Sequence, residues 1–233
     1  MNLDWQYSAF GSPAPLAREV FSEIEKTILQ LVVDGFQRWQ AGGFSQFGDH
    51  EDHYTVRLVA CMKDVRRERN LTFMPRYQDV EPSERMLKGL DDPAHAPRID
   101  MTVSWGLLTD DAYFSIECKR LAPDDLARLY VVEGMERFVR GYYGAKAQGG
   151  GMIGYVIRGT PRTVLERVNT HVQTAKALGS EQRLIPANPV GWLDDVFESN
   201  HPRQLPLGPI HLTHLFFDLT GLASGPISGR GEA

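Results

Sequence analysis

The chain has 233 residues, of which 42% are hydrophobic and 24% are charged, and its formal net charge at pH 7 is −5. This length suits one domain, or one domain with an elaborated end, and no window approaches the ~18 consecutive apolar residues of a membrane span. The acidic balance argues against a protein that coats nucleic acid, but it is compatible with an enzyme that contacts a phosphate backbone locally.

The N-terminal sequence MNLDWQYSAFGSPAP lacks a basic start followed by an apolar run, so no secretory signal is expected. Cys61 and Cys118 lie in apolar-patterned segments and need not pair, which is typical of a reducing compartment. We therefore expect a cytoplasmic protein without a membrane segment. The composition predicts a lead-in over residues 1–14, a single domain over 15–220 and a disordered tail over 221–233.

The first half of the domain begins with two predicted helices. Apolar residues at spacings of three and four predict a helix over Pro15–Gln40, which should end by Gly43, and a second helix over about His50–Val65. A short strand is predicted over Leu71–Arg76. Residues 77–97 are rich in Pro, Asp, Glu and Gly and are predicted to form a long loop, which is uncommon in a compact domain unless the loop has a function.

Two strands follow within Arg98–Leu121, joined by a connection at Gly106–Asp111. Apolar and polar residues alternate along both strands, which is the pattern of a strand with two different faces. The apolar positions are Ile99, Met101, Val103 and Trp105 in the first strand and Phe114, Ile116 and Cys118 in the second.

The second half of the chain alternates helices and strands. A helix is predicted from near Pro123 to about Tyr143, and the glycines at 149–151 should interrupt the pattern before a buried strand over Met152–Arg158. A helix over about Thr160–Ala177 follows, then an irregular stretch over 179–209 with a short amphipathic piece near Trp192–Phe197, and a last strand over Leu212–Thr220. This order predicts an α/β fold with a central mixed sheet of four or five strands flanked by helices.

Charged side chains gather on the polar faces of the two strands within Arg98–Leu121. Glu117 and Lys119 project from the same face because side chains alternate along a strand. A hairpin register that places Asp100 beside Glu117 would bring two carboxylates and an ammonium together. The alternative interpretation is that Glu117 and Lys119 form an exposed ion pair, which is common on strands.

This grouping suits metal-dependent hydrolysis of a phosphodiester. Mg²⁺ prefers carboxylate oxygens, retains water and accepts phosphate oxygens as further ligands. The carboxylates of Asp100 and Glu117 and the backbone carbonyl of Cys118 are the candidate metal ligands. Lys119 would orient the nucleophile or stabilise the charge that develops in the transition state.

The pattern Ile99-Asp100, 16 further residues, then Glu117-Cys118-Lys119 resembles the signature of the PD-(D/E)XK nucleases. Arg98-Ile99 precedes Asp100 where the signature has Pro. The order of helix, three strands, helix and strand over residues 50–160 also resembles the restriction-endonuclease-like core of this family. The resemblance implies that Asp100 and Glu117 bind Mg²⁺, or Mn²⁺ in its place, and that Lys119 is the catalytic lysine.

Many members of the family add an acidic residue from the helix that precedes the sheet. Glu51 and Glu23 are the candidates here, and Glu51 is preferred because it shares the inward face of its helix with Tyr54 and Leu58. The helix after the second strand carries Arg137, which would lie near the site or the nucleic acid, although an intrahelical pair with Glu133 is an adequate alternative.

The sequence therefore predicts a Mg²⁺-dependent endonuclease for which DNA is the favoured substrate. The resemblance suggests restriction or antiviral defence as its setting, and the short chain suggests a homo-oligomer or the effector of a partner protein. One alternative is a non-catalytic binding or regulatory subunit of the same fold. Another is a small-molecule hydrolase or sensor that uses the region Gly149–Gly159. The seven histidines show no strong zinc-binding spacing.

Overall fold

A computed structural model of the chain describes residues 15–43, 50–80, 90, 92, 98–105, 113–142, 144 and 147–221. The predicted lead-in, the connection Gly106–Asp111 and, apart from Gly221, the predicted tail lie outside these residues. Within the described part of the chain, no helix combines the length and apolarity that a bilayer crossing requires.

The centre of the fold is a mixed sheet in the order β1-β2-β3-β4-β7-β6-β5. The strands are β1 (Phe73–Val80), β2 (Arg98–Trp105), β3 (Tyr113–Leu121), β4 (Gly149–Val156), β5 (Ile185–Pro186), β6 (Val196–His201) and β7 (Ile210–Asp218). The pairs β3–β4 and β4–β7 are parallel, and the other neighbours are antiparallel. The predicted α/β class and mixed sheet are therefore confirmed.

The prediction of four or five strands was wrong, because the described residues form seven. The additional strands β5 and β6 come from the stretch 179–209, which the sequence presented as irregular. The strand β5 has only two residues, and β6 reads VFESNH, which lacks sustained apolar alternation. The strand β1 also extends to Val80, so residues 77–80 of the predicted loop belong to a strand, and most of residues 81–97 lie outside the described part of the chain.

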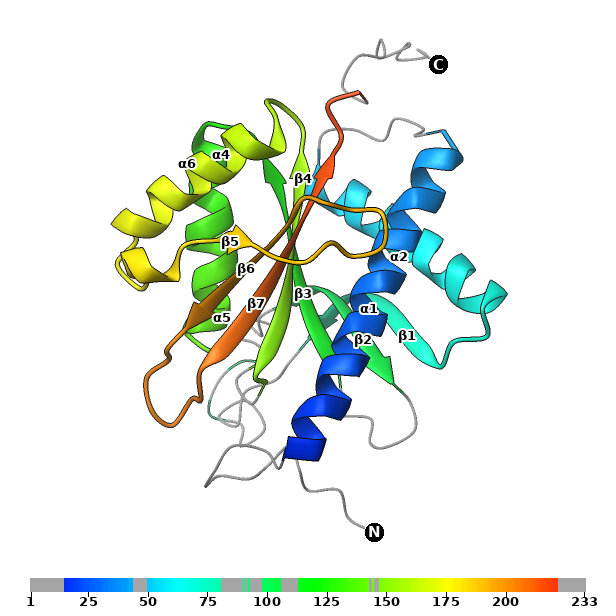
Figure 1. The fold of residues 1–233 in the computed structure, drawn as a ribbon, viewed down its shortest axis with the longest axis horizontal. Helices are drawn as coiled ribbons and strands as arrows, with labels where there is room; N and C mark the ends of the chain where they lie inside the picture. The colour runs from blue at the N-terminus through cyan, green and yellow to red at the C-terminus, as the bar shows by residue number, and fades with distance from the viewer. Residues whose placement is uncertain are drawn as a thin grey trace.

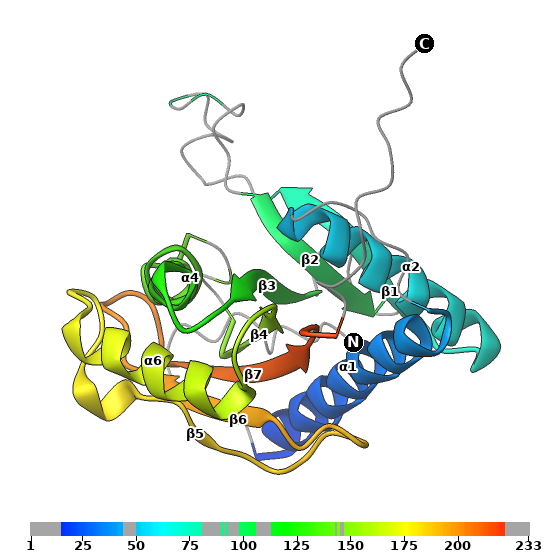
Figure 2. The same cartoon turned by 90° about the horizontal axis from the view of Figure 1, so that it is seen from above.

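Helices cover both faces of this sheet (Figures 1 and 2). The helices α1 (Pro15–Ala41) and α2 (Glu51–Glu68) pack on one face, where buried residues of all the central strands form the first core cluster. The other face carries α4 (Asp125–Leu129), η3 (Tyr130–Met135), α5 (Glu136–Val139) and α6 (Pro161–Thr174), with the short η4 (Ser180–Gln182) beside β6. The alternation of side chains along each strand explains why there are two cores.

The helix predicted from Pro123 to Tyr143 differs from the observed one in two ways. Its middle, η3, is a π-helical turn, a feature that inserts one extra residue and is frequent at functional sites. The helix ends at Val139, and Gly141 follows with φ of 70°. A glycine with a left-handed backbone is a common helix terminator, which explains the early end.

The glycine run 149–151 was predicted to interrupt the pattern, but it forms the start of β4, and all eight residues of this strand are buried. The absence of side chains makes room for neighbours. A Cβ atom at Gly150 would lie 2.7 Å from Cε1 of Phe138, and one at Gly151 would lie 3.0 Å from Cγ1 of Ile116. These glycines therefore serve packing within the sheet, and they form no ligand-binding loop.

We expect Gly150→Ala to lower the free energy of unfolding by about 1–3 kcal/mol, because the new methyl group overlaps a buried aromatic ring. Gly149→Ala is the matched control, since its Cβ would lie no closer than 3.4 Å to the nearest atoms, an ordinary contact distance. Urea denaturation of both variants tests this packing. Equal stability of the two variants would contradict it.

Candidate functional site

The site lies where β2 and β3 separate. Their antiparallel pairing runs from Ser104–Tyr113 to Met101–Ile116, and β3 then continues alongside β4 alone. Backbone N–H groups of β3 that would have faced β2 need other acceptors beyond that point. Side-chain carboxylates supply them.

Two carboxylates bind the exposed edge of β3. Oδ2 of Asp100 accepts a hydrogen bond of 2.9 Å from the backbone N–H of Cys118. Oε2 of Glu51, the first residue of α2, accepts one of 2.9 Å from the backbone N–H of Arg120. Asp100 and Glu51 thereby take the place of a neighbouring strand along this part of β3. Each carboxylate also makes a second contact within the site.

The register agrees with the one that the sequence hypothesis required. Met101–Ile116 is the last pair, and the adjacent residues are Asp100, which precedes Met101 in β2, and Glu117, which follows Ile116 in β3. Cys118 belongs to the core cluster under α1 and α2, whereas Glu117 and Lys119 project toward the opposite face. Asp100, Glu117 and Lys119 are consequently gathered at one place.

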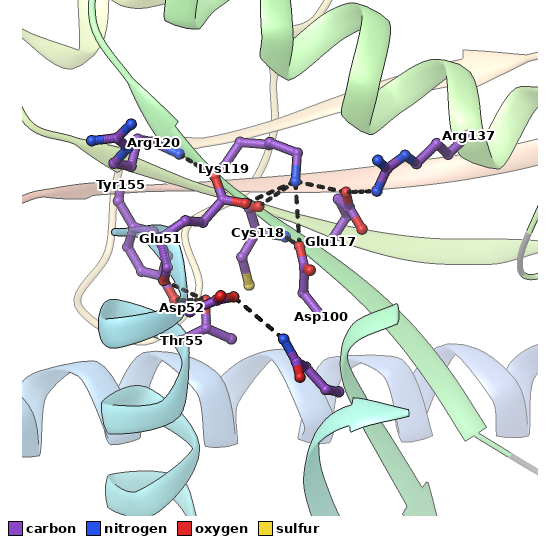
Figure 3. A network of polar contacts seen from close by, with 11 residues as sticks. Glu51, Asp52, Thr55, Asp100, Glu117, Cys118, Lys119, Arg120, Arg137 and Tyr155 are labelled. Atoms are coloured by element: carbon purple, nitrogen blue, oxygen red, sulfur yellow. Dashed lines mark hydrogen bonds and ion pairs between the residues drawn. The ribbon is translucent and has the colours of Figure 1, made fainter. Parts of the chain in front are cut away.

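The ammonium of Lys119 lies at the centre of this group (Figure 3). Its Nζ is 2.7 Å from Oε1 of Glu117 and 2.9 Å from Oε1 of Glu51. It is 3.5 Å from Oδ2 of Asp100 and donates a hydrogen bond of 2.9 Å to the backbone carbonyl of Cys118. Oxygen atoms from α2, β2 and β3 thus converge on a single cation.

Glu117 is the most enclosed member of the group, with a side chain that is 0% exposed. A buried carboxylate is costly unless it is paired. Lys119 provides one partner, and Nη1 of Arg137 in α5 lies 2.9 Å from the same oxygen, Oε1. Gly134 in η3 allows this helix to approach the sheet closely, since a Cβ there would lie 2.7 Å from Cε of Met152 in β4. Arg137 therefore joins the site, as the position of its helix in the sequence suggested.

The electrostatics of the site keep Lys119 charged. Burial alone would lower the pKa of Lys119, but the carboxylates of Glu117, Asp100 and Glu51 raise it well above its ordinary value. Burial raises the pKa of Glu51, and the attraction of Lys119 opposes that rise. The ammonium is thus held as a permanent counter-ion at neutral pH.

The structure distinguishes Glu51 from the other acidic candidate. Glu23 on α1 has a side chain that is 67% exposed and forms an ion pair of 2.6 Å with Lys26, one turn along the same helix. Glu51 reaches two groups of β3 instead. Asp52, its neighbour, accepts a hydrogen bond of 3.5 Å from Nε2 of Gln78 instead.

The thiol of Cys118 takes no part in this group. It is fully buried, and burial raises the pKa of the thiol well above its ordinary value. Only the backbone carbonyl of Cys118 faces the site, where it accepts the hydrogen bond from Lys119. This carbonyl oxygen is the candidate metal ligand that the sequence pattern indicated.

The donor atoms suit a hard divalent cation by type, because they are carboxylate and carbonyl oxygens. Among the described residues, however, no three His, Cys, Asp or Glu side chains are placed as a metal-binding group in this arrangement. The Lys119 ammonium lies among Glu51, Asp100 and Glu117 instead.

A second polar cluster, which the sequence analysis did not identify, lies within the core beneath α4 to α6. Hydrogen bonds link Tyr130 Oη to His214 Nδ1 at 2.8 Å and His214 Nε2 to Ser199 Oγ at 2.8 Å. They continue from Ser199 Oγ to His201 Nε2 at 2.7 Å and from His201 Nδ1 to the carbonyl oxygen of Gln182 at 3.0 Å. All five side chains are buried.

The proton positions in this cluster can be assigned in order, starting from Gln182 at one end of the chain of hydrogen bonds. The carbonyl oxygen of Gln182 can only accept, so Nδ1 of His201 donates and its Nε2 accepts from Ser199. Ser199 then accepts from Nε2 of His214, whose Nδ1 accepts from the hydroxyl of Tyr130. Every group is satisfied with both histidines neutral. Burial lowers the pKa of His201 to about 4 and that of His214 well below its ordinary value.

The sequence carried a weak signal for this cluster. Ser199 and His201 are two residues apart, which places them on the same face of a strand. That signal required β6 to be recognised as a strand. His211, by contrast, pairs with Asn200 at 3.0 Å on the other side of the sheet, so His211 and His214 do not form a joint site.

Comparison with protein-family models found no matching model, and comparisons with curated proteins and with solved structures found no significant similarity.

The buried histidines predict a loss of stability in mild acid. Unfolded histidine titrates near pH 6.5, whereas His201 in the fold titrates near 4. The contribution of the two buried, neutral histidines to the free energy of unfolding is fully present above pH 6.5. It is lost as the pH falls toward 4, by about 1.4 kcal/mol per pH unit for each histidine, because the unfolded chain binds protons that the folded chain does not. Urea denaturation between pH 7 and 5 measures this slope. His201→Gln should make it shallower, and an unchanged slope would contradict the assignment.

Proposed function

We propose that this protein is a Mg²⁺-dependent nuclease with a restriction-endonuclease-like core, for which DNA is the favoured substrate. The observation that carries the proposal is the convergence of Glu51, Asp100 and Glu117, from three separate elements, on the ammonium of Lys119. An exposed ion pair on a strand would not require this burial or these partners.

The order of elements supports the proposed core. The helix α2 precedes β1, β2 and β3, and the segment from α4 to α5 connects β3 to the parallel strand β4. This is the helix, three strands, helix and strand order for which the sequence resembles the PD-(D/E)XK nucleases. The strands β5, β6 and β7 extend the sheet beyond that core.

Each residue of the site has a distinct proposed task. Asp100, Glu117 and the carbonyl of Cys118 would hold the cation, with Mn²⁺ as an alternative to Mg²⁺. When bound, such a cation polarises the phosphate and lowers the pKa of a coordinated water. Lys119 would donate a hydrogen bond to the attacking water or to a phosphate oxygen, which stabilises the developing negative charge.

Glu51 and Arg137 would act as positioning residues. Glu51 contacts Lys119 at 2.9 Å and binds the backbone of Arg120, so it limits where the ammonium can lie. Arg137 contacts Oε1 of Glu117 at 2.9 Å, so it limits where that carboxylate can lie. We further propose that the protein is cytoplasmic, that it acts in restriction or antiviral defence, and that it works as a homo-oligomer or with a partner protein.

Incubation with supercoiled plasmid in Mg²⁺ or Mn²⁺ tests the proposed activity. The wild-type protein is expected to nick or linearise the plasmid, and EDTA should abolish the cleavage. Asp100→Asn, Glu117→Gln and Lys119→Ala should each slow cleavage about 100-fold or more, because each removes a group that stabilises the transition state. Gel electrophoresis over time gives the rates.

Lys176→Ala is the matched control, since Lys176 is exposed and lies outside the site. It should cleave at the wild-type rate. Parallel assays with single-stranded DNA and RNA identify the preferred nucleic acid. Equal cleavage by wild type and Lys119→Ala would refute the proposed site, and binding of nucleic acid without any cleavage would favour the non-catalytic subunit.

A further inference from the structure

The Lys119 ammonium occupies the oxygens that a metal ion would need. An ammonium has three protons to donate. Its three shortest contacts, at 2.7, 2.9 and 2.9 Å, are with Glu117, Glu51 and the carbonyl of Cys118. Asp100 lies slightly further away, at 3.5 Å. The cation of the side chain and an added divalent cation would therefore compete for the same lone pairs.

Charge balance makes this competition strong. The site holds the carboxylates of Glu51, Asp100 and Glu117, and the cations of Lys119 and Arg137 offset two of these three charges. The remaining negative charge is too small to attract a divalent cation strongly. A divalent cation beside an ammonium that has not moved would also experience like-charge repulsion at short range in a largely buried environment.

The structure indicates which part of Lys119 can move. Its stem is largely enclosed, because the side chain is only 10% exposed. The more open side of the cluster is formed by Asp100 and Glu51, whose side chains are 18% and 27% exposed, whereas Glu117 is 0% exposed. The ammonium would therefore move toward solvent. On that path it loses its carboxylate partners unless another anion pairs with it. A phosphate group of a bound nucleic acid provides that anion.

We infer that Lys119 is an internal counter-ion that must leave its carboxylates before a divalent cation binds, and that a bound phosphodiester receives the displaced ammonium. Cation and nucleic acid would then bind cooperatively through this one side chain. The inference rests on the proposed nuclease function, and it adds a regulatory property: the site has weak affinity for the cation until substrate is present.

Calorimetric titration with Ca²⁺, which prefers the same type of oxygen ligand as Mg²⁺, measures the competition. Lys119→Met keeps the length of the side chain and removes its charge. This variant is expected to bind Ca²⁺ about tenfold more tightly than the wild type. Lys119→Arg, which keeps the charge, should bind as weakly as the wild type, and Lys176→Met serves as the control outside the site.

The cooperativity is tested by repeating these titrations with a short DNA duplex at saturating concentration and the same free Ca²⁺. For the wild type and Lys176→Met, the duplex should tighten Ca²⁺ binding about fivefold or more. For Lys119→Met it should have little effect, because no ammonium has to be displaced. Equal tightening in wild type and Lys119→Met would overturn the proposed coupling.

A measurement on the wild-type protein alone avoids dependence on how the variants fold. Nitrogen-15 spectra of the lysine side chains report the exchange of ammonium protons with water. The Lys119 protons, which are held by three oxygens, should exchange slowly without Ca²⁺ and rapidly with it. Slow exchange that persists at saturating Ca²⁺ would overturn the inference.

These outcomes separate the inference from the proposed function. A wild-type protein that binds the cation and cleaves DNA, together with a Lys119→Met variant that binds the cation no more tightly, would refute the counter-ion role and leave the nuclease proposal in place. A wild-type protein that neither binds a divalent cation, with or without duplex, nor cleaves DNA would refute both.

Discussion

The loss of pairing between β2 and β3 beyond Met101 is the constraint from which the candidate site follows. Backbone N–H groups on a strand edge need acceptors, and here the carboxylates of Asp100 and Glu51 provide them. Because these carboxylates are anchored to the backbone of β3, they are held beside the next side chains of that strand, Glu117 and Lys119. A requirement of backbone hydrogen bonding thus concentrates negative charge at one point, and the Lys119 ammonium offsets it.

The helical segment η3 connects this site to the buried polar cluster beneath α4 to α6. Gly134 leaves room for the side chain of Met152 and lies near Lys119, while Tyr130, at the other end of the same π-helical turn, hydrogen-bonds His214. A buried network in which every donor and acceptor is satisfied is rigid, because any displacement leaves a polar group unpaired. Such a network gives η3 a fixed position, and through α5 it also fixes the origin of Arg137, which holds Glu117.

The charge arrangement differs from a surface ion pair in its burial and in the number of its partners. Glu117 is completely buried, and Lys119 is nearly so. Such groups cost free energy unless they are paired, and structural stability alone could be achieved with apolar residues of similar size. Perturbed titratable groups gather preferentially at functional sites. This tendency and the order of elements are the grounds on which we propose a catalytic role for the site.

The sequence by itself determined the features that depend on local periodicity. Alternation along β3 placed Glu117 and Lys119 on one face with Cys118 on the other, and helical spacing predicted α1, α2 and α6 closely. Prediction from the sequence failed where the local pattern is short or weak, since β5 has two residues and β6 is polar. The glycines of β4 have the pattern of a break in regular structure, although they make room for Phe138.

Tertiary structure alone decided which distant groups meet. Glu51 and Lys119 are 68 positions apart, and Tyr130 and His214 are 84 positions apart. Periodicity along one element carries no information about such contacts, since they depend on how both faces of the sheet are covered. The choice between Glu51 and Glu23 and the register of Asp100 against Glu117 were therefore hypotheses from the sequence. Only packing determines them, because a shift of one residue in a strand would send every side chain to the opposite face.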